Sequence, residues 1–131
     1  MKIYLAGKWE EHELIKTYAD RLRAVGHTIT LPWFEMHLGS TPFPQAARED
    51  VQGVLDADAC VFIFERELAY AGALVELGIA IGTNKAILIV GPAMTRCVFT
   101  SIIERVDTFD KVNEWLTAQE PPELHSTSRC T

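Results

Sequence analysis

The six residues from Ala59 to Phe64, ACVFIF, are all apolar, and this run limits most strongly how the chain can fold. A strand without polar side chains has no face to offer to water. It therefore fits the centre of a parallel sheet that is covered by helices on both sides. The run predicts an α/β fold with this strand in the middle of the sheet.

Strand and helix patterns alternate on both sides of this run. Four more strands are predicted, at Lys2 to Ala6, His27 to Leu31, Ala86 to Val90 and near Val106. Apolar residues at helical spacing predict helices at His12 to Val25, Gln45 to Ala57, Gly72 to Ile81 and Phe109 to Leu116. Such alternation gives a parallel sheet with right-handed crossovers. We expect a five-stranded, Rossmann-like (flavodoxin-like) sheet with helices on both faces, in one domain over residues 1–120, followed by a polar tail at 121–131.

Two local expectations depend on finer patterns. The segment Trp33 to Pro44 is expected to be a loop, because it contains Gly39, Ser40, Pro42 and Pro44 in close succession. The helix after it is expected to turn its apolar side inward, with Ala46, Val51, Val54 and Leu55 on that side.

Composition excludes several classes of partner. The formal net charge is −6, whereas binding a nucleic-acid polymer requires clustered Lys and Arg. A single nucleotide remains possible, because a few local donors can hold it. The sequence shows neither a signal peptide nor an apolar stretch of about 18 residues, so we expect a cytoplasmic protein without a membrane partner. The cysteines and histidines have no metal-binding spacing, and we expect no metal site.

In a parallel sheet of this kind, the ligand crevice lies beyond the carboxyl ends of the strands, at the point where the strand order reverses. Four stretches of the sequence follow strand ends and are candidates to form the crevice. They are Gly7 to Glu10, Pro32 to Phe34, Glu65 to Gly72 and Gly91 to Thr95.

Glu76 is the first candidate catalytic residue. It lies in AGALVELGIAIG, about one turn inside the predicted helix that follows the central strand. We expect the helix N-terminus to favour its ionised form, and an ionised carboxylate in a partly dry pocket can attack an anomeric carbon. The alternative is a carboxylate that only complements the helix dipole. Asp50 is a second acid that could orient the first, or else a solvated helical charge beside Arg48 and Glu49.

The stretch after the first strand and the start of the predicted loop supply candidate binding residues. Gly7 allows backbone amides to approach a ligand, and Lys8 could hold a phosphate. Trp9 and Trp33 could stack on a base, or could instead be packing residues. No GxGxxG or P-loop pattern is present, which argues against a dinucleotide or ATPase site.

Three blocks of the sequence, KIYLAG, DVQGVLDADACVFI and GALVELGIAIGTNK, resemble the nucleoside 2-deoxyribosyltransferase superfamily. That superfamily includes the 2'-deoxynucleoside 5'-monophosphate N-glycosidases. The resemblance extends from about Lys2 to Leu116. It implies a Rossmann-like parallel sheet, a small nucleoside or nucleotide as substrate, no cofactor, and a homodimer or larger assembly whose sites are built across the subunit interface.

The resemblance also implies roles for particular residues. Glu76 matches the nucleophile and Asp50 the residue that positions it, while Tyr4 and Gly7 match residues beside the bound nucleoside. Gly72 matches a loop glycine near the sugar. The segment CVFTSII places Thr100 or Ser101 where the monophosphate hydrolases contribute a hydroxyl from the neighbouring subunit.

The sequence departs from the family pattern in two places. Tyr70 stands where transferases have an acidic residue and the hydrolases a serine, and Lys8, Trp9 and Glu10 replace phosphate-binding Ser and Arg residues. Three functions therefore stay open: a base-transferring enzyme, a monophosphate N-glycosidase, and a nucleotide-binding module without turnover. An electron carrier is disfavoured because no phosphate loop follows the first strand.

Overall fold

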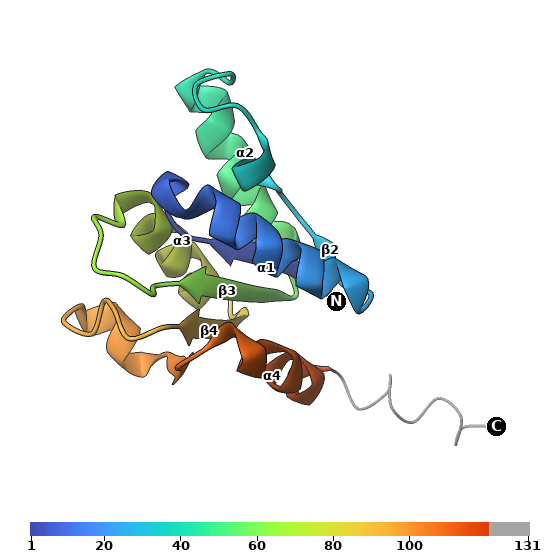
Figure 1. Ribbon diagram of the computed structural model, residues 1–131. Coiled ribbons are helices and arrows are strands. Elements are labelled where there is room, and N and C mark those ends of the chain that lie inside the picture. Colours follow the sequence, from blue (N-terminus) through green and yellow to red (C-terminus); the bar gives the residue numbers. More distant parts are fainter. Residues whose placement is uncertain (121–131) are drawn as a thin grey trace.

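The computed structural model describes residues 1–120, which form a five-stranded sheet in the order β2-β1-β3-β4-β5 (Figure 1). All four strand pairings are parallel. The predicted α/β fold with a parallel five-stranded sheet is confirmed, and the predicted tail at 121–131 lies outside the described residues. The strands are β1 (Lys2–Ala6), β2 (Thr28–Ile29), β3 (Ala59–Ile63), β4 (Ala86–Val90) and β5 (Glu104–Val106).

Helices cover both faces of the sheet. In the view of Figure 1, α1 and α4 lie in front of the sheet and α3 behind it, with α2 extending beyond its upper edge. The helices are α1 (His12–Ala24), α2 (Phe43–Asp56), α3 (Ala71–Gly82) and α4 (Val112–Gln119), and the short 3-10 helices are η1 (Trp9–Glu11), η2 (Trp33–Glu35), η3 (Val98–Ile102) and η4 (Phe109–Lys111).

Alternation along the strands sends neighbouring side chains into two separate cores. Ile3 and Leu5 of β1 pack with α1 and α4, whereas Tyr4 packs with α2 and α3. Every residue of β3 is fully buried, as expected of a strand in the middle of the sheet. Tyr4 is consequently placed beneath the two helices that carry the candidate acids.

Two expectations about α2 are wrong. The helix begins at Phe43 rather than Gln45, and it includes Pro44, because proline fits the first turn of a helix, where its missing N–H has no partner. Val54 is buried as expected, but Val51 and Leu55 are 39% and 40% exposed. The predicted second strand is also shortened to two residues.

Candidate active site

A cavity of about 380 Å³ opens at the carboxyl ends of β1 and β3, where the strand order reverses. Its size falls in the range of small-molecule sites. Three of the four predicted stretches contribute to its lining, whereas no residue from Gly91 to Thr95 does. The lining includes most of the predicted site residues: Tyr4, Gly7, Lys8, Trp9, Trp33, Asp50, Tyr70, Gly72 and Glu76.

Three polar side chains meet on the floor of this cavity, each from a different element. Tyr4 comes from β1, Asp50 from α2 and Glu76 from α3, and Tyr4 is hydrogen-bonded to the Glu76 carboxyl group. Gly53 makes the arrangement possible. A Cβ at this position would lie 3.0 Å from the Tyr4 ring and from Cβ of Leu31, so a side chain here, one turn after Asp50, would have to displace these neighbours or move α2 away from β1.

Burial controls the protonation of these groups. The pKa of Glu76 is raised to about 8: burial is the largest cause, the negative charge of Asp50 adds to it, and the hydrogen bond from Tyr4 acts in the opposite direction. The pKa of Asp50 is also raised, by its own burial and by Glu49, and that of Tyr4 is raised well above its usual value. Our expectation that the helix dipole keeps Glu76 ionised is therefore wrong. Glu76 is the sixth residue of α3, beyond the first turn in which the dipole acts.

Two tryptophans form flat walls of the cavity. Trp9 stacks on His12 with ring centroids 4.1 Å apart and planes within 6°. Nδ1 of His12 also donates a hydrogen bond to the Trp9 carbonyl (2.8 Å). Nε1 of Trp33 donates to the Leu5 carbonyl (2.8 Å), so its N–H is already used. Both rings are held in fixed orientations, which suits them to stacking on a planar base.

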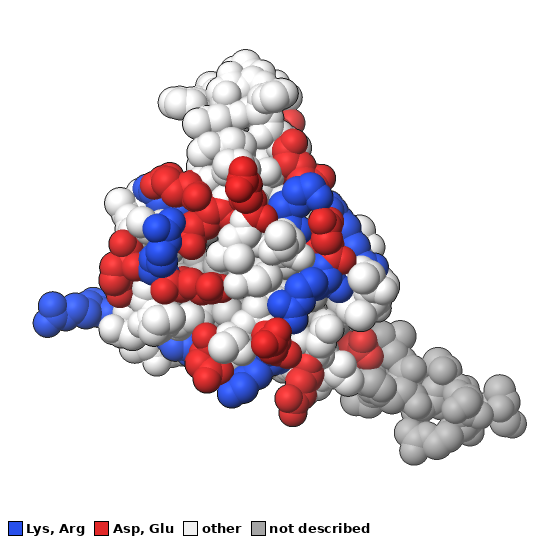
Figure 2. All heavy atoms as spheres, viewed as in Figure 1, with Lys and Arg blue, Asp and Glu red and all other residues white. Residues whose placement is uncertain are grey.

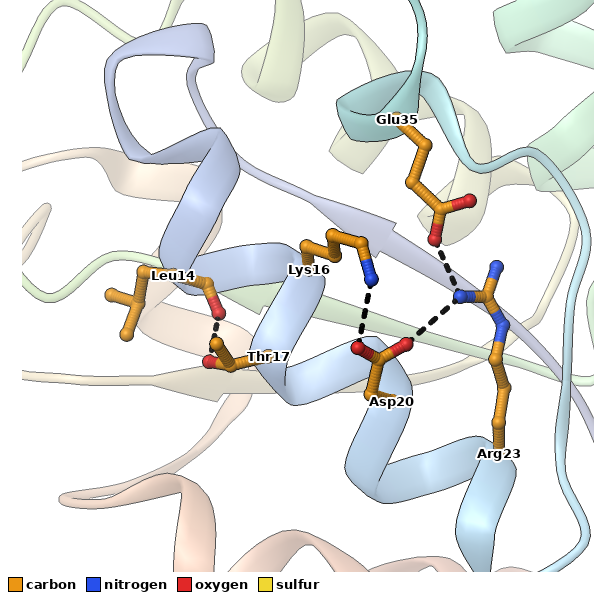
Figure 3. A network of polar contacts seen from close by, with 6 residues as sticks. All are labelled: Leu14, Lys16, Thr17, Asp20, Arg23 and Glu35. Atoms are coloured by element: carbon orange, nitrogen blue, oxygen red, sulfur yellow. Dashed lines mark hydrogen bonds and ion pairs between the residues drawn. The ribbon is translucent and has the colours of Figure 1, made fainter.

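The segment that carries Trp33 is tied to α1 by charged side chains (Figure 3). Arg23 on α1 reaches Glu35 of η2 at 2.5 Å and Asp20 at 3.3 Å, and Lys16 holds the other oxygen of Asp20 at 2.8 Å. These pairs are largely exposed, so each stabilises the protein only slightly. Of these pairs, Arg23–Glu35 joins η2 to α1, whereas the other two lie within α1.

Tyr70 and Lys8 use their polar atoms within the protein. The Tyr70 hydroxyl lies 3.2 Å from Oε1 of Glu11 and 2.9 Å from the Arg66 carbonyl. Nζ of Lys8 donates to the Ala69 carbonyl at 2.5 Å and lies 3.9 Å from Glu10. Gly72 has open space where a Cβ would be, so this part of the wall is accessible.

Thr100 and Ser101 do not line the cavity of their own chain. Thr100 on η3 is buried, and its hydroxyl donates to the Met94 and Cys97 carbonyls (2.6 and 2.9 Å). Ser101 is exposed, and its hydroxyl bonds only within η3, to the Val98 carbonyl (2.5 Å). Ser101 is therefore the accessible hydroxyl of the two.

Several lining residues were missed by sequence reasoning. They come from the loop before α2 and from its first two turns: Met36, His37, Leu38, Thr41, Phe43, Ala46 and Glu49. No motif marks this segment. Its signal is the absence of charge, since residues 36–47 contain no Lys, Arg, Asp or Glu. Figure 2 shows the matching uncharged projection at the top of the molecule, above the charged face of α1.

Residues 1–120 contain neither a helix that could cross a membrane nor a group of three or more His, Cys, Asp or Glu side chains that could hold a metal ion.

The strand order and the cavity at its reversal define a small Rossmann-like (flavodoxin-like) α/β protein with a small-molecule site. The sequence profile of the nucleoside 2-deoxyribosyltransferase family matches residues 3–115. The chain belongs to this family, which confirms the resemblance seen in the sequence.

Solved structures of three proteins share the fold. A 2-deoxyribosyltransferase from Bacillus psychrosaccharolyticus is 23% identical with a TM-score of 0.65, covering 86% of this chain and 90% of its own. A conserved protein from Enterococcus faecalis V583 is 15% identical with a TM-score of 0.72 (92% and 99% covered). A CMP N-glycosidase from Clostridium botulinum is 12% identical with a TM-score of 0.62 (90% and 99%). No curated protein sequence is significantly similar to the chain.

The raised pKa of Glu76 predicts a specific pH dependence of stability. Folding favours the neutral acid, so this contribution is complete below the reference pKa of 4.5 and is lost as the pH rises through about 8. Glu76→Gln stays neutral, so its unfolding free energy should increase relative to wild type from about pH 5 to pH 9, by a few kcal/mol at about 1.4 kcal/mol per pKa unit. Urea unfolding across this range measures the difference. A difference that does not vary with pH would contradict the assignment.

Proposed function

We propose that the protein cleaves the N-glycosidic bond of a nucleoside and transfers the sugar to a second base, with Glu76 as the nucleophile. The observation that carries this proposal is the enclosed Glu76 carboxyl group, hydrogen-bonded to Tyr4 and close to Asp50, in a cavity of nucleoside size. Membership of the nucleoside 2-deoxyribosyltransferase family supports the same chemistry.

The reaction consists of two displacements at C1' of the sugar. The ionised carboxylate of Glu76 attacks C1', the C1'–N bond breaks, and the base leaves with the bonding electron pair and takes up a proton. This gives a glycosyl ester on Glu76. A nitrogen of the incoming base then attacks C1', releases the carboxylate and loses a proton. Two inversions at C1' retain its configuration.

The environment of Glu76 suits this role. Only roughly a tenth of the carboxyl groups are ionised at pH 7 when the pKa is about 8, so turnover should rise with pH up to that point. The ionised form is poorly solvated and thus more reactive than a free carboxylate. Asp50 and Tyr4 are positioning residues, since Asp50 acts through its charge on Glu76 and Tyr4 through its hydrogen bond.

The charges around the cavity favour a nucleoside over a 5'-monophosphate. Three carboxyl groups line it, from Glu49, Asp50 and Glu76, whereas Lys8 is its one Lys or Arg residue. The Lys8 ammonium group is already bonded to the Ala69 carbonyl. A phosphate would have to compete with that bond while approaching three acids. Hydrolysis of a nucleoside monophosphate is therefore the second candidate.

A third candidate is a binding module without turnover. The mostly neutral state of Glu76 near pH 7 favours it, because a protonated carboxyl group is not a nucleophile but can still donate a hydrogen bond to a ligand. Substitution of Glu76 separates this candidate from the two enzymes.

We further propose that the active form is a homodimer or larger assembly in which Ser101 of one subunit reaches the site of another. The outer faces of α2 and α3, and η3, carry exposed apolar residues, and exposed apolar surface is typical of an interface. The most exposed of them flank Ser101. These exposed residues are Val51, Leu55, Val75, Val98, Phe99 and Ile102.

Incubation with deoxynucleosides, ribonucleosides and their 5'-monophosphates, with and without a free acceptor base, tests the reaction. We expect chromatography to show base exchange with nucleosides and none with Glu76→Gln, which removes the nucleophile but should still bind ligand. Release of base without an acceptor would indicate hydrolysis. If Glu76→Gln matched the wild type in turnover, covalent catalysis at this residue would be wrong; ligand binding without any base release would favour the binding module.

Lys8→Ala tests phosphate recognition. If Lys8 only links the segment after β1 to the loop before α3, through its bond to the Ala69 carbonyl, nucleosides and their monophosphates should lose affinity by similar factors. A phosphate contact would instead weaken the monophosphate selectively, by about 1.5–3 kcal/mol for a charge-assisted bond, or about tenfold or more in Kd. Calorimetric titration with each ligand measures the two effects, and a selective loss would contradict the nucleoside preference.

Complementation tests the shared site. Ser101→Ala and Glu76→Gln should each lower turnover, but when they are co-expressed a mixed dimer combines an intact Glu76 from one subunit with an intact Ser101 from the other. We expect activity to reappear in the mixed species separated by two different tags. Activity no higher than the two homodimers would show that Ser101 does not act across an interface.

A further inference from the structure

The loop 64–70 joins β3 to α3 and supplies part of the cavity wall, and it is anchored to the segment after β1. Oε1 of Glu11 lies 3.2 Å from the Tyr70 hydroxyl, and Oε2 of Glu11 accepts from Nε of Arg66 at 3.3 Å. The Glu11 side chain is only 5% exposed although it carries a carboxyl group. A buried carboxyl group requires such partners, and both of its partners here come from the one loop.

Tyr70 also determines where α3 begins. It is the N-cap residue of α3 but makes no side-chain capping bond, and its carbonyl accepts the backbone N–H of Leu74 at 3.0 Å. The ring packs against Phe64 with centroids 4.6 Å apart. The hydroxyl contacts Glu11 and the Arg66 carbonyl. The first turn of α3 is thus held by the Tyr70 side chain in place of a cap.

Glu76 lies six residues after Tyr70, about 9 Å further along the helix axis. A shift of the first turn would move the Glu76 carboxyl group relative to Tyr4, which belongs to β1 and does not move with α3. Misplacement of a reacting group by about 1 Å can cost about a hundredfold in rate.

We propose that Glu11 and Tyr70 are a pair of positioning residues that hold the first turn of α3 and thereby place Glu76 for attack. The proposal rests on the glycosidic chemistry proposed above. Tyr70 lines the cavity, but its hydroxyl serves Glu11 and the Arg66 carbonyl, so its role differs from that of a group that recognises the base.

The chain contains a matched control on the same loop. The hydroxyl of Tyr18 on α1 donates to the carboxylate of Glu65, at the β3 end of the loop, and neither residue lines the cavity. Tyr18→Phe and Tyr70→Phe each remove one tyrosine–carboxylate contact from this loop. Only the second lies next to α3.

Turnover of the nucleoside substrate provides the first test. Tyr70→Phe and Glu11→Ala should each lower kcat about tenfold or more with KM changed less than about threefold, and the double variant should lose no more than either single variant. Glu11→Gln keeps a carbonyl acceptor and should recover most of the loss. Tyr18→Phe should stay within about twofold of wild type. Losses in the singles that multiply in the double variant, or an unchanged kcat in Tyr70→Phe, would overturn the pairing.

Amide hydrogen exchange provides a test that does not need activity. The Leu74 N–H should exchange about tenfold faster in Tyr70→Phe than in Tyr18→Phe, at matched global stability, because it is bonded to the Tyr70 carbonyl. Equal exchange in the two variants would contradict the proposal that Tyr70 holds the first turn of α3. Faster exchange in Tyr70→Phe, in a protein that shows no turnover, would support that proposal and refute only the proposed reaction.

Discussion

The close packing of α2 and α3 on Tyr4 is the constraint on which the site depends. Tyr4 is almost completely buried in the core beneath these helices, yet its hydroxyl reaches the Glu76 carboxyl group. Gly53 removes the side chain that would otherwise keep α2 away from the ring. The close approach of α2 and α3 to Tyr4, which completes the hydrophobic core, also brings Asp50 toward Glu76. Packing and electrostatics are therefore coupled here: the carboxyl group becomes difficult to ionise because the helices fit so closely around it.

At neutral pH, a buried acid with a raised pKa does not stabilise the folded protein. Folding must either keep the acid protonated above its ordinary pKa or remove its charge from water, and both cost free energy. The rest of α3 offsets this cost with apolar and small residues, and its buried side, with Ala73, Leu77 and Ala80, packs on the central strands. Glu76 is the one charged residue in the helix. A single acid in an otherwise uncharged helix, placed in a cavity wall, is more readily explained by chemistry than by folding.

Much of the fold could be predicted from the sequence because its signals are local. The apolar run of β3 and the alternating elements around it determine a parallel sheet, and the strand-end rule then locates part of the cavity wall. The loop before α2 could not be predicted in this way, since its apolar residues have no periodicity and form a wall only once α2 is in place. Glu11 was missed for a related reason. It is an ordinary acid in the sequence, and only the long-range contact with Tyr70, 59 residues away, makes it part of the site.

Tyr70 shows how a departure from the family pattern is compatible with the reaction that we propose. An acid at this position, as in the transferases, would place a charge in the cavity wall near Glu76. In this chain the acid is Glu11, which does not line the cavity, and the Tyr70 hydroxyl links its carboxyl group to the start of α3. Tyr70 therefore adds no charge to the cavity, whose lining acids are Glu49, Asp50 and Glu76. In the reaction that we propose, base recognition is assigned to Trp9, Trp33 and the uncharged loop before α2, whereas Glu11 and Tyr70 place Glu76. The contacts of Glu76 with Tyr4, and of Tyr70 with Glu11 and Leu74, do not involve that loop, so the proposed base contacts are separate from those that place Glu76.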